Sequence, residues 1–298
     1  MMSLVNTNSD YLRTMGIAEE NPLVGLIVAV YYLGCALGAV IFSWYADSFG
    51  RKKSIFLCLV TASLGNLIMF VAGLNYSRGA MAVMFLGRVV MGVGVGGVDS
   101  VIPVYSAELA EDEARGKALA QEFQSNIFGL NMAFAINLGV TIALSKSNQW
   151  AWRIPIIAMQ VYPVSLLLCI RRLPESPRWF ISHDRKEDAR EALDQIYGED
   201  EGESKCDELE KSHEREADQS VTYTDMFKPG NQQFHPTMIT IMGQVNQALT
   251  GYGAVSVYGP QIFQVRTARH LRVLDVSFSK RQILTSIRTA HRLQRPSV

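Results

Sequence analysis

Five long stretches that are almost free of charge constrain this chain more than any other feature of its sequence. Each contains at most two charged residues, and they span residues 22–44, 54–74, 80–104, 118–144 and 152–171. A helix that crosses the hydrocarbon core of a bilayer needs about 20 predominantly apolar residues. The sequence therefore predicts five transmembrane helices, with buried core helices of a soluble protein as the alternative.

A sixth stretch, residues 237–263, is uncharged but polar, and we expect it to be a weaker sixth transmembrane helix. Residues 1–21 are polar and lack the apolar core of a cleavable signal peptide. The positive charge on alternate loops, described below, nevertheless predicts that this N-terminus is extracellular. The fold class that follows is an all-α polytopic membrane protein.

Charge is concentrated outside these stretches. Residues 171–236 hold 17 acidic and 10 basic residues, which predicts a cytoplasmic charged linker. Within it, residues 185–198 have helical spacing, and we expect a short helix followed by a loose acidic segment. The tail, residues 264–298, carries eight Lys or Arg and one acid. It is either foreign to the fold, or a sign that residues 237–263 do not fully insert, or a basic tail that binds anionic lipid.

Positive charge falls on alternate loops between the predicted spans. Cytoplasmic loops of membrane proteins carry an excess of Lys and Arg, so these loops are expected in the cytoplasm. The residues are Arg51, Lys52, Lys53, Arg115, Lys117, Arg171 and Arg172.

Composition excludes several classes of protein. A net charge of zero argues against a nucleic-acid binder, and four cysteines argue against a disulfide scaffold. No histidine has metal-ligand spacing and no G-x-S-x-G occurs, so we expect neither an enzyme nor catalytic residues, metal or cofactor. Gly92, Gly94 and Gly97 fit G-x-G-x-x-G, but no strand precedes them. Close packing of helices is the favoured interpretation, and a dinucleotide site is the alternative.

Four motifs occur in order along the chain. They are YADSFGRKK (45–53), GRVVMGVGVGG (87–97), PVYSAE with RG (103–108 and 115–116) and PESPRW (174–179). Together they resemble the sugar-porter branch of the major facilitator superfamily. The sequences of these segments are most similar to those of fungal sugar and polyol permeases. The resemblance covers roughly residues 10–263.

The resemblance implies a partial fold, in which the chain corresponds to helices 2–7 of 12. Members of the superfamily transport solutes by rocking two six-helix halves around a central site. The implied function is transport of a sugar, polyol or similar hydroxylated solute by alternating access, either facilitated or coupled to protons. We expect a multi-pass protein of the plasma membrane whose partners are the bilayer, a small polyhydroxylated solute and protons, with no nucleic acid.

The expected state of this chain is an inactive fragment, because the second half is nearly absent. The alternative is a membrane protein that senses a sugar or interacts with an intact relative without transporting.

The resemblance also assigns residues to a cytoplasmic latch that holds the helix ends together. The alternative is plain solvated loop charge, with each pair worth about 0–1 kcal/mol. The latch residues are Asp47, Gly50, Arg51, Glu108, Arg115, Glu175 and Arg178.

Arg88 and Asp99 are the proton-coupling candidates, because ionisable residues within spans are expensive and usually functional. In proton-coupled relatives the arginine that matches Arg88 pairs with an aspartate of helix 1. The alternative is that Arg88 extends outward to the membrane interface. For Asp99 the favoured interpretation is membership of the polar loop network.

Amides within spans are the substrate-binding candidates, because sugar hydroxyls need donors and acceptors that do not ionise. Two polar faces on one helix require a wall of protein or water: Gln121, Gln124 and Asn131 lie on one, and Glu122, Asn126 and Asn137 on the other. On the predicted sixth span, Gln244, Gln247 and Tyr258 share a face with Gly251. Plain helix-packing amides are the alternative.

Overall fold

The computed structural model describes residues 8–16, 23–74, 79–110, 114–144, 148–217, 225–231 and 233–251, together with the single residues 5, 253 and 255. Every regular element in these ranges is a helix, which confirms the all-α class. The chain divides into two compact units, essentially residues 3–234 and residues 235–298, and each is described by itself.

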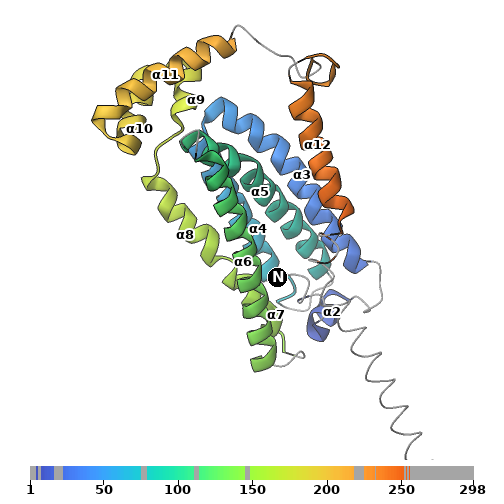
Figure 1. Ribbon diagram of the computed structural model, residues 1–298. Helices are drawn as coiled ribbons and strands as arrows, with labels where there is room; N and C mark the ends of the chain where they lie inside the picture. Colours follow the sequence, from blue (N-terminus) through green and yellow to red (C-terminus); the bar gives the residue numbers. More distant parts are fainter. Residues whose placement is uncertain are drawn as a thin grey trace, which may run out of the picture. The chain divides into compact units, whose positions relative to one another are not determined.

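The first unit contains ten α-helices and two short 3-10 helices among its described residues, and α12 belongs mainly to the second unit (Figure 1). The elements are α2 (Ser9–Met15), α3 (Leu23–Phe49), α4 (Arg51–Val71), α5 (Ala80–Leu109), α6 (Arg115–Leu144), α7 (Trp150–Ala158), α8 (Val161–Cys169), η1 (Ile170–Arg172), α9 (Pro177–Ser182), α10 (Lys186–Tyr197), α11 (Glu199–Ala217), η2 (Asp225–Phe227) and α12 (Phe234–Leu249).

Five helical segments of the described chain are long and apolar enough to cross a membrane, as the sequence predicts. They are Gly25–Phe49, Arg51–Val71, Ala80–Leu109, Arg115–Leu144 and Trp150–Arg172. The first and third run five residues further toward the charged loops than the expected spans, so Asp47 and Glu108 lie on helices rather than in loops.

The fifth span differs from the expected single helix because it is interrupted between α7 and α8. Gln160 N–H donates to the Ile157 carbonyl, which leaves the Ile156 carbonyl without its usual helical donor. The buried amide of Asn66 on α4 supplies that donor at 2.9 Å. Pro163, which has no N–H, lies just beyond the interruption.

The sixth predicted span is described only in part. Helix α12 covers its first half, and most residues after Gly251 lie outside the described residues. Insertion of residues 237–263 therefore stays a prediction, and the tail 264–298 also lies outside the described residues.

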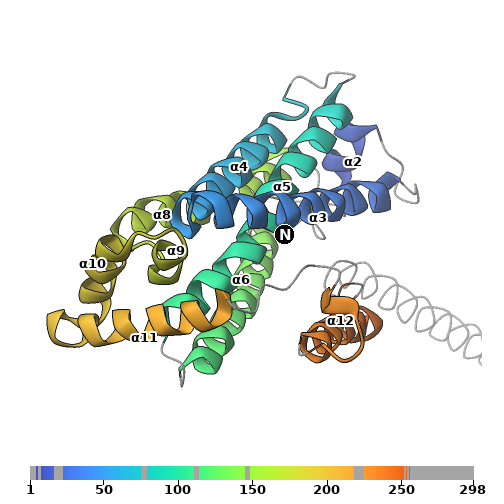
Figure 2. The ribbon, with the colours of Figure 1, turned by 90° about the horizontal axis from the view of Figure 1, so that it is seen from above.

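Helix α5 lies between α3 and α4 and makes most of its contacts with them (Figures 1 and 2). Helices α9, α10 and α11 gather at one end of the first unit, whereas α2 and α7 lie at the opposite end. We call the end with α9–α11 the charged end, because the charged helix ends of α3, α4, α5 and α6 meet there.

Glycines allow α5 to approach both neighbours at backbone distance. A Cβ placed on Gly96 would lie 2.0 Å from the Cys35 carbonyl oxygen of α3. A Cβ on Gly94 would lie 2.3 Å from the Ala62 nitrogen of α4, so consecutive glycines serve different partners. Small residues allow this approach between helices in lipid. Gly92, whose Cβ would lie 2.4 Å from the Tyr31 carbonyl oxygen of α3, and Gly94 belong to the G-x-G-x-x-G pattern, so the pattern serves helix packing.

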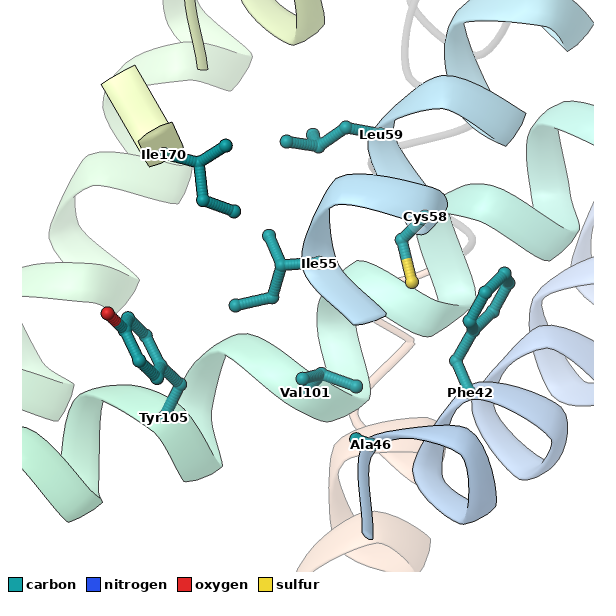
Figure 3. Packing of buried hydrophobic residues seen from close by; sticks show 8 residues of the cluster. All are labelled: Phe42, Ala46, Ile55, Cys58, Leu59, Val101, Tyr105 and Ile170. Carbon is teal, nitrogen blue, oxygen red and sulfur yellow. The ribbon is translucent and has the colours of Figure 1, made fainter. Parts of the chain in front are cut away.

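A cluster of buried apolar side chains lies beside these glycines, toward the charged end (Figure 3). It joins α3, α4, α5 and η1, and it places the helix ends that carry the candidate latch at fixed positions. Its members are Phe42, Ala46, Ile55, Cys58, Leu59, Val101, Tyr105 and Ile170.

Two segments are more ordered than the sequence indicated. The stretch expected to be a loose acidic segment forms the 19-residue helix α11, which packs on α10 and α9. Within the polar N-terminus, α2 buries Tyr11, Leu12 and Met15. Asn8 caps α2 by accepting from two backbone N–H groups, and the Trp152 indole donates to the Asp10 carboxylate at 3.1 Å.

The glycine packing predicts a large difference between two identical substitutions. Gly96→Ala forces a Cβ against the α3 backbone, and we expect it to destabilise the protein by about 3 kcal/mol or more. Gly139→Ala on α6 meets nothing within 4 Å and gains helix propensity, so it should be neutral or stabilising by up to about 1 kcal/mol. Thermal unfolding in detergent measures both, and equal effects would contradict this packing.

Candidate functional site

The strongest side-chain contact at the charged end joins Arg51, the first residue of α4, to Glu108 near the end of α5. Arg51 Nε and Nη2 each donate to one oxygen of Glu108 at 3.0 Å. The two side chains are only 13% and 11% exposed. Two parallel charge-assisted hydrogen bonds between partly buried groups are among the strong polar contacts of proteins.

Glu175, in the loop before α9, binds the N-terminus of α4. Its carboxylate accepts from the Lys52 backbone N–H at 2.9 and 3.2 Å. The first N–H groups of a helix have no intrahelical acceptor, and the helix dipole favours an anion there. Glu175 therefore ties the segment after the fifth span to the start of the second.

Gly50 fits this arrangement because of its backbone and its missing side chain. It links α3 to α4 at φ +105°, a conformation that favours glycine. A Cβ there would lie 2.5 Å from Glu175 Oε2. Glycine is therefore favoured at this position for two reasons: the turn requires a positive φ, and the Glu175 carboxylate occupies the space of a side chain.

Two contacts at the charged end were missed by sequence reasoning. The Trp179 indole N–H of α9 donates to the Asp47 carbonyl of α3 at 2.9 Å. The Tyr105 hydroxyl of α5 donates to the Pro174 carbonyl at 2.6 Å. Both residues belong to the quoted motifs PESPRW and PVYSAE, so the signal was present, but the sequence did not reveal their partners.

The remaining latch candidates also lie at the charged end. Asp47 on α3 approaches Arg51 Nη1 at 3.1 Å but is 71% exposed, so it is a solvated charge, as the alternative to the latch expects. Arg51 and Glu108 are shielded from water and are therefore not solvated charges. Arg115 donates to the Ala107 carbonyl at 3.1 Å, and Arg178 lines a cavity together with Arg115 and Glu108. The structure thus brings together all seven residues that the motifs indicated.

Arg88 lies on α5, away from the charged end, and is 5% exposed. Its Nε donates to the Ile27 carbonyl of α3 at 3.3 Å, and its guanidinium lies 5.1 Å from the centre of the Tyr31 ring. Arg88 therefore points at α3, and the alternative that it extends outward to the membrane interface is wrong.

Asp99 is exposed on α5 and makes no hydrogen bond within the described part of the chain, so its expected membership of the loop network is not observed. Two turns further along, Ser106 Oγ donates to Glu122 of α6 at 3.1 Å. Ser106 was not singled out from the sequence, and its hydroxyl also lies 3.1 Å from the Ile102 carbonyl of its own helix.

Helix α6 exposes the amides predicted to bind substrate. Gln121, Gln124 and Asn131 are all exposed, and Asn131 donates only to the Ile127 carbonyl of its own helix. The only described residue that α6 buries is Asn137. An apolar helix with this much exposed amide surface can offer several hydrogen bonds to a neutral solute.

The second group of substrate candidates lies in the other unit. Gln244 and Gln247 are exposed on α12, and Tyr258 lies outside the described residues. Among the residues that the structure describes, no group of three His, Cys, Asp or Glu side chains is arranged to hold a metal ion.

Comparison with known proteins supplies the family. The family described as "Sugar (and other) transporter" matches residues 2–269, which is most of the chain. The chain belongs to this sugar transporter family. Membership confirms the resemblance to the sugar-porter branch of the major facilitator superfamily, and it makes the chain a multi-pass membrane protein.

Several curated transporters are similar to the chain. The major myo-inositol transporter IolT of Bacillus subtilis is 30% identical over 243 residues, which cover 80% of this chain and 49% of that protein. The low-affinity glucose transporter HXT1 of Saccharomyces cerevisiae is 27% identical over 275 residues, 86% of this chain and 46% of that protein. The chain therefore spans about half the length of the curated relatives it matches.

A solved structure shows the same fold. The xylose transporter XylE of Escherichia coli, in a partially occluded inward-open conformation, superposes with a TM-score of 0.73 at 22% identity. The match covers 87% of this chain and 62% of that one. The chain thus has a partial major facilitator fold, as predicted.

A double-mutant cycle at Arg51 and Glu108 tests whether their contact is a strong one. With Arg51→Gln, Glu108→Gln and the double variant, we expect a coupling energy of about 1.5–3 kcal/mol, because the pair is shielded from water. The control cycle at Arg185 and Asp188, whose side chains are 48% and 43% exposed, should give about 0–1 kcal/mol. Thermal unfolding measures both cycles, and equal couplings would contradict a strong latch.

Proposed function

We propose that this chain supplies one wall of the path by which a transporter moves a sugar, a polyol or a similar hydroxylated solute. The exposed amide face of α6, formed by Gln121, Gln124 and Asn131, is the observation that carries the proposal. Amides donate and accept hydrogen bonds without ionising, which suits a neutral solute with many hydroxyls. The names of three similar proteins, a myo-inositol, a glucose and a xylose transporter, support this class of solute.

We further propose that the charged end faces the cytoplasm of the plasma membrane and acts as a latch. The concentration of Lys and Arg on its loops supports this orientation. The Arg51–Glu108 fork and the Glu175 cap join the starts and ends of α4 and α5 to the loop before α9. Alternating access rocks one half of a transporter against the other, so these contacts would hold the helix ends of this half together as the half moves.

Arg88 and Asp99 remain the candidates for proton coupling. One structural neighbour is described as a proton:xylose symporter, which supports coupling in this fold. Arg88 is held against α3 and Asp99 is exposed on the same helix, eleven residues further along. In this proposal Asp99 binds and releases the proton, whereas Arg88 keeps its positive charge inside the span.

A site between two walls closes only when both are present. Within the first unit, the amide face of α6 is exposed, and Asn137 is the only residue that the described part of α6 buries. We therefore propose that the 298-residue chain binds solute weakly and does not transport it alone. Uptake of radiolabelled glucose, xylose or myo-inositol by this chain alone, in yeast without its own transporters, would contradict that statement.

Weak binding is measurable by saturation-transfer NMR on the purified chain in nanodiscs. Losing one hydrogen bond costs about 0.5–1.5 kcal/mol, so Gln124→Ala should raise the apparent Kd of a bound solute roughly two- to tenfold. Leu119→Ala is the matched control, because Leu119 lies about 140° around the same helix. Equal effects, or the absence of a signal for all three solutes, would contradict the proposed wall. Solute binding at nanomolar affinity without uptake would instead favour a sensor.

A further inference from the structure

A cavity of about 430 Å³ lies between the bundle and the helices of the charged end. The ends of α5 and α6 contribute Glu108 and Arg115, and α9 contributes Arg178. Helix α11 forms the facing wall with Lys205, Lys211 and Arg215. Its volume is within the range of small-molecule sites.

Helix α11 distributes its charges unevenly around this cavity. Its sequence contains nine acidic residues and only three basic ones. All three basic residues line the cavity, whereas Glu208 is the one acid that does so among the α11 side chains that the structure describes, and it pairs with Lys205 at 3.4 Å. A helix with an acidic sequence thus presents a mainly basic face to the cavity.

Two acids of α11 pair with cations of α10. Glu203 pairs with Arg190 of α10 at 3.2 Å, and Glu210 pairs with Lys186 of the same helix. The Glu210 carboxylate raises the pKa of Lys186 above its usual value, mainly through their hydrogen bond. The acidic side of α11 is therefore used for packing on α10, which leaves the basic side for the cavity.

Cations reach the cavity from three elements. Arg115 and Arg178 enter from α6 and α9, opposite α11. On α11, Lys211 and Arg215 take part in none of the ion pairs found among the described residues. The hydroxyl groups of Ser212 and Tyr197 also line the cavity. Arg, Lys and hydroxyl donors around one space suit the tetrahedral oxygens of a phosphate group.

We propose that this cavity binds a phosphate group, carried either by an anionic lipid headgroup or by a phosphorylated metabolite. The site is separate from the solute path and does not depend on transport. A bound phosphate would join α11 to the ends of α5 and α6, in a cavity that Glu108 of the Arg51–Glu108 fork itself lines. It would therefore hold the helices of the charged end against the bundle and stabilise the latched state.

Three acidic residues next to the cavity-lining residues in the sequence could compete with phosphate, so the experiment needs a control for them. Residues 111–113 are Glu-Asp-Glu, join α5 to α6 and lie outside the described residues. Their carboxylates compete with phosphate if they reach the cavity cations. The triple variant Glu111→Gln/Asp112→Asn/Glu113→Gln therefore belongs in the experiment.

The test measures thermal unfolding of the purified chain in nanodiscs, at constant ionic strength. One arm titrates inorganic pyrophosphate into phosphatidylcholine nanodiscs, and the other adds phosphatidylinositol 4-phosphate to the bilayer. Lys211→Gln/Arg215→Gln should weaken the apparent affinity by about tenfold or more, because two charged donors are lost. The control Arg171→Gln/Arg172→Gln removes the same charge from η1, outside the cavity lining and away from the α10–α11 contacts, and should leave the affinity unchanged.

A stabilising shift with pyrophosphate, lost in the α11 variant alone, identifies a soluble phosphate ligand. A shift with the lipid only, lost in the same variant, identifies a headgroup. The proposal is overturned if neither probe shifts the unfolding temperature, or if both double variants lose the shift equally. It is also overturned if only the neutralised 111–113 variant responds, because the chain's own carboxylates would then occupy the cations.

Discussion

Backbone contact between α5 and its two neighbours is the constraint on which the rest of the structure depends. Lipid tails are as apolar as the side chains they replace, so helices in a bilayer gain little from the hydrophobic effect and rely on close packing. Gly96 faces α3 and Gly94 faces α4, and neither position has room for one methyl group. The three helices therefore form one layer, and their ends hold fixed positions.

These fixed ends allow a small set of charges to act as a unit. Arg51 begins α4 and Glu108 stands one residue before the end of α5, so helix packing alone brings them together. Glu175 arrives from the far end of the fifth span and binds backbone N–H groups rather than another side chain. The charged end is held by one forked ion pair and one helix cap, and both depend on the geometry that Gly50 and the packed glycines provide.

Hydropathy was sufficient to predict the spans, because about 20 uncharged residues leave few other folds. The family resemblance assigned the candidate latch residues, and the structure places all of them at one end of the bundle. Partners across the fold were not predictable: nothing local indicates that Trp179 donates to Asp47 or that Ser106 contacts Glu122. The sequence could not decide whether the Arg88 side chain points into the protein or toward the membrane interface, because that depends on which helix packs against it. The helix α11 was missed because its stability comes from packing and ion pairs with α10 rather than from an apolar run.

The account rests on the charged end facing the cytoplasm, and cysteine accessibility tests this directly. In a variant without its four native cysteines, Arg185→Cys reports the charged end and Trp150→Cys the opposite end; the native side chain of Arg185 is 48% exposed and Trp150 is 47% exposed. A membrane-impermeant maleimide should label Trp150→Cys in intact yeast cells and Arg185→Cys only after permeabilisation. The reverse pattern, or labelling of both in intact cells, would contradict the account.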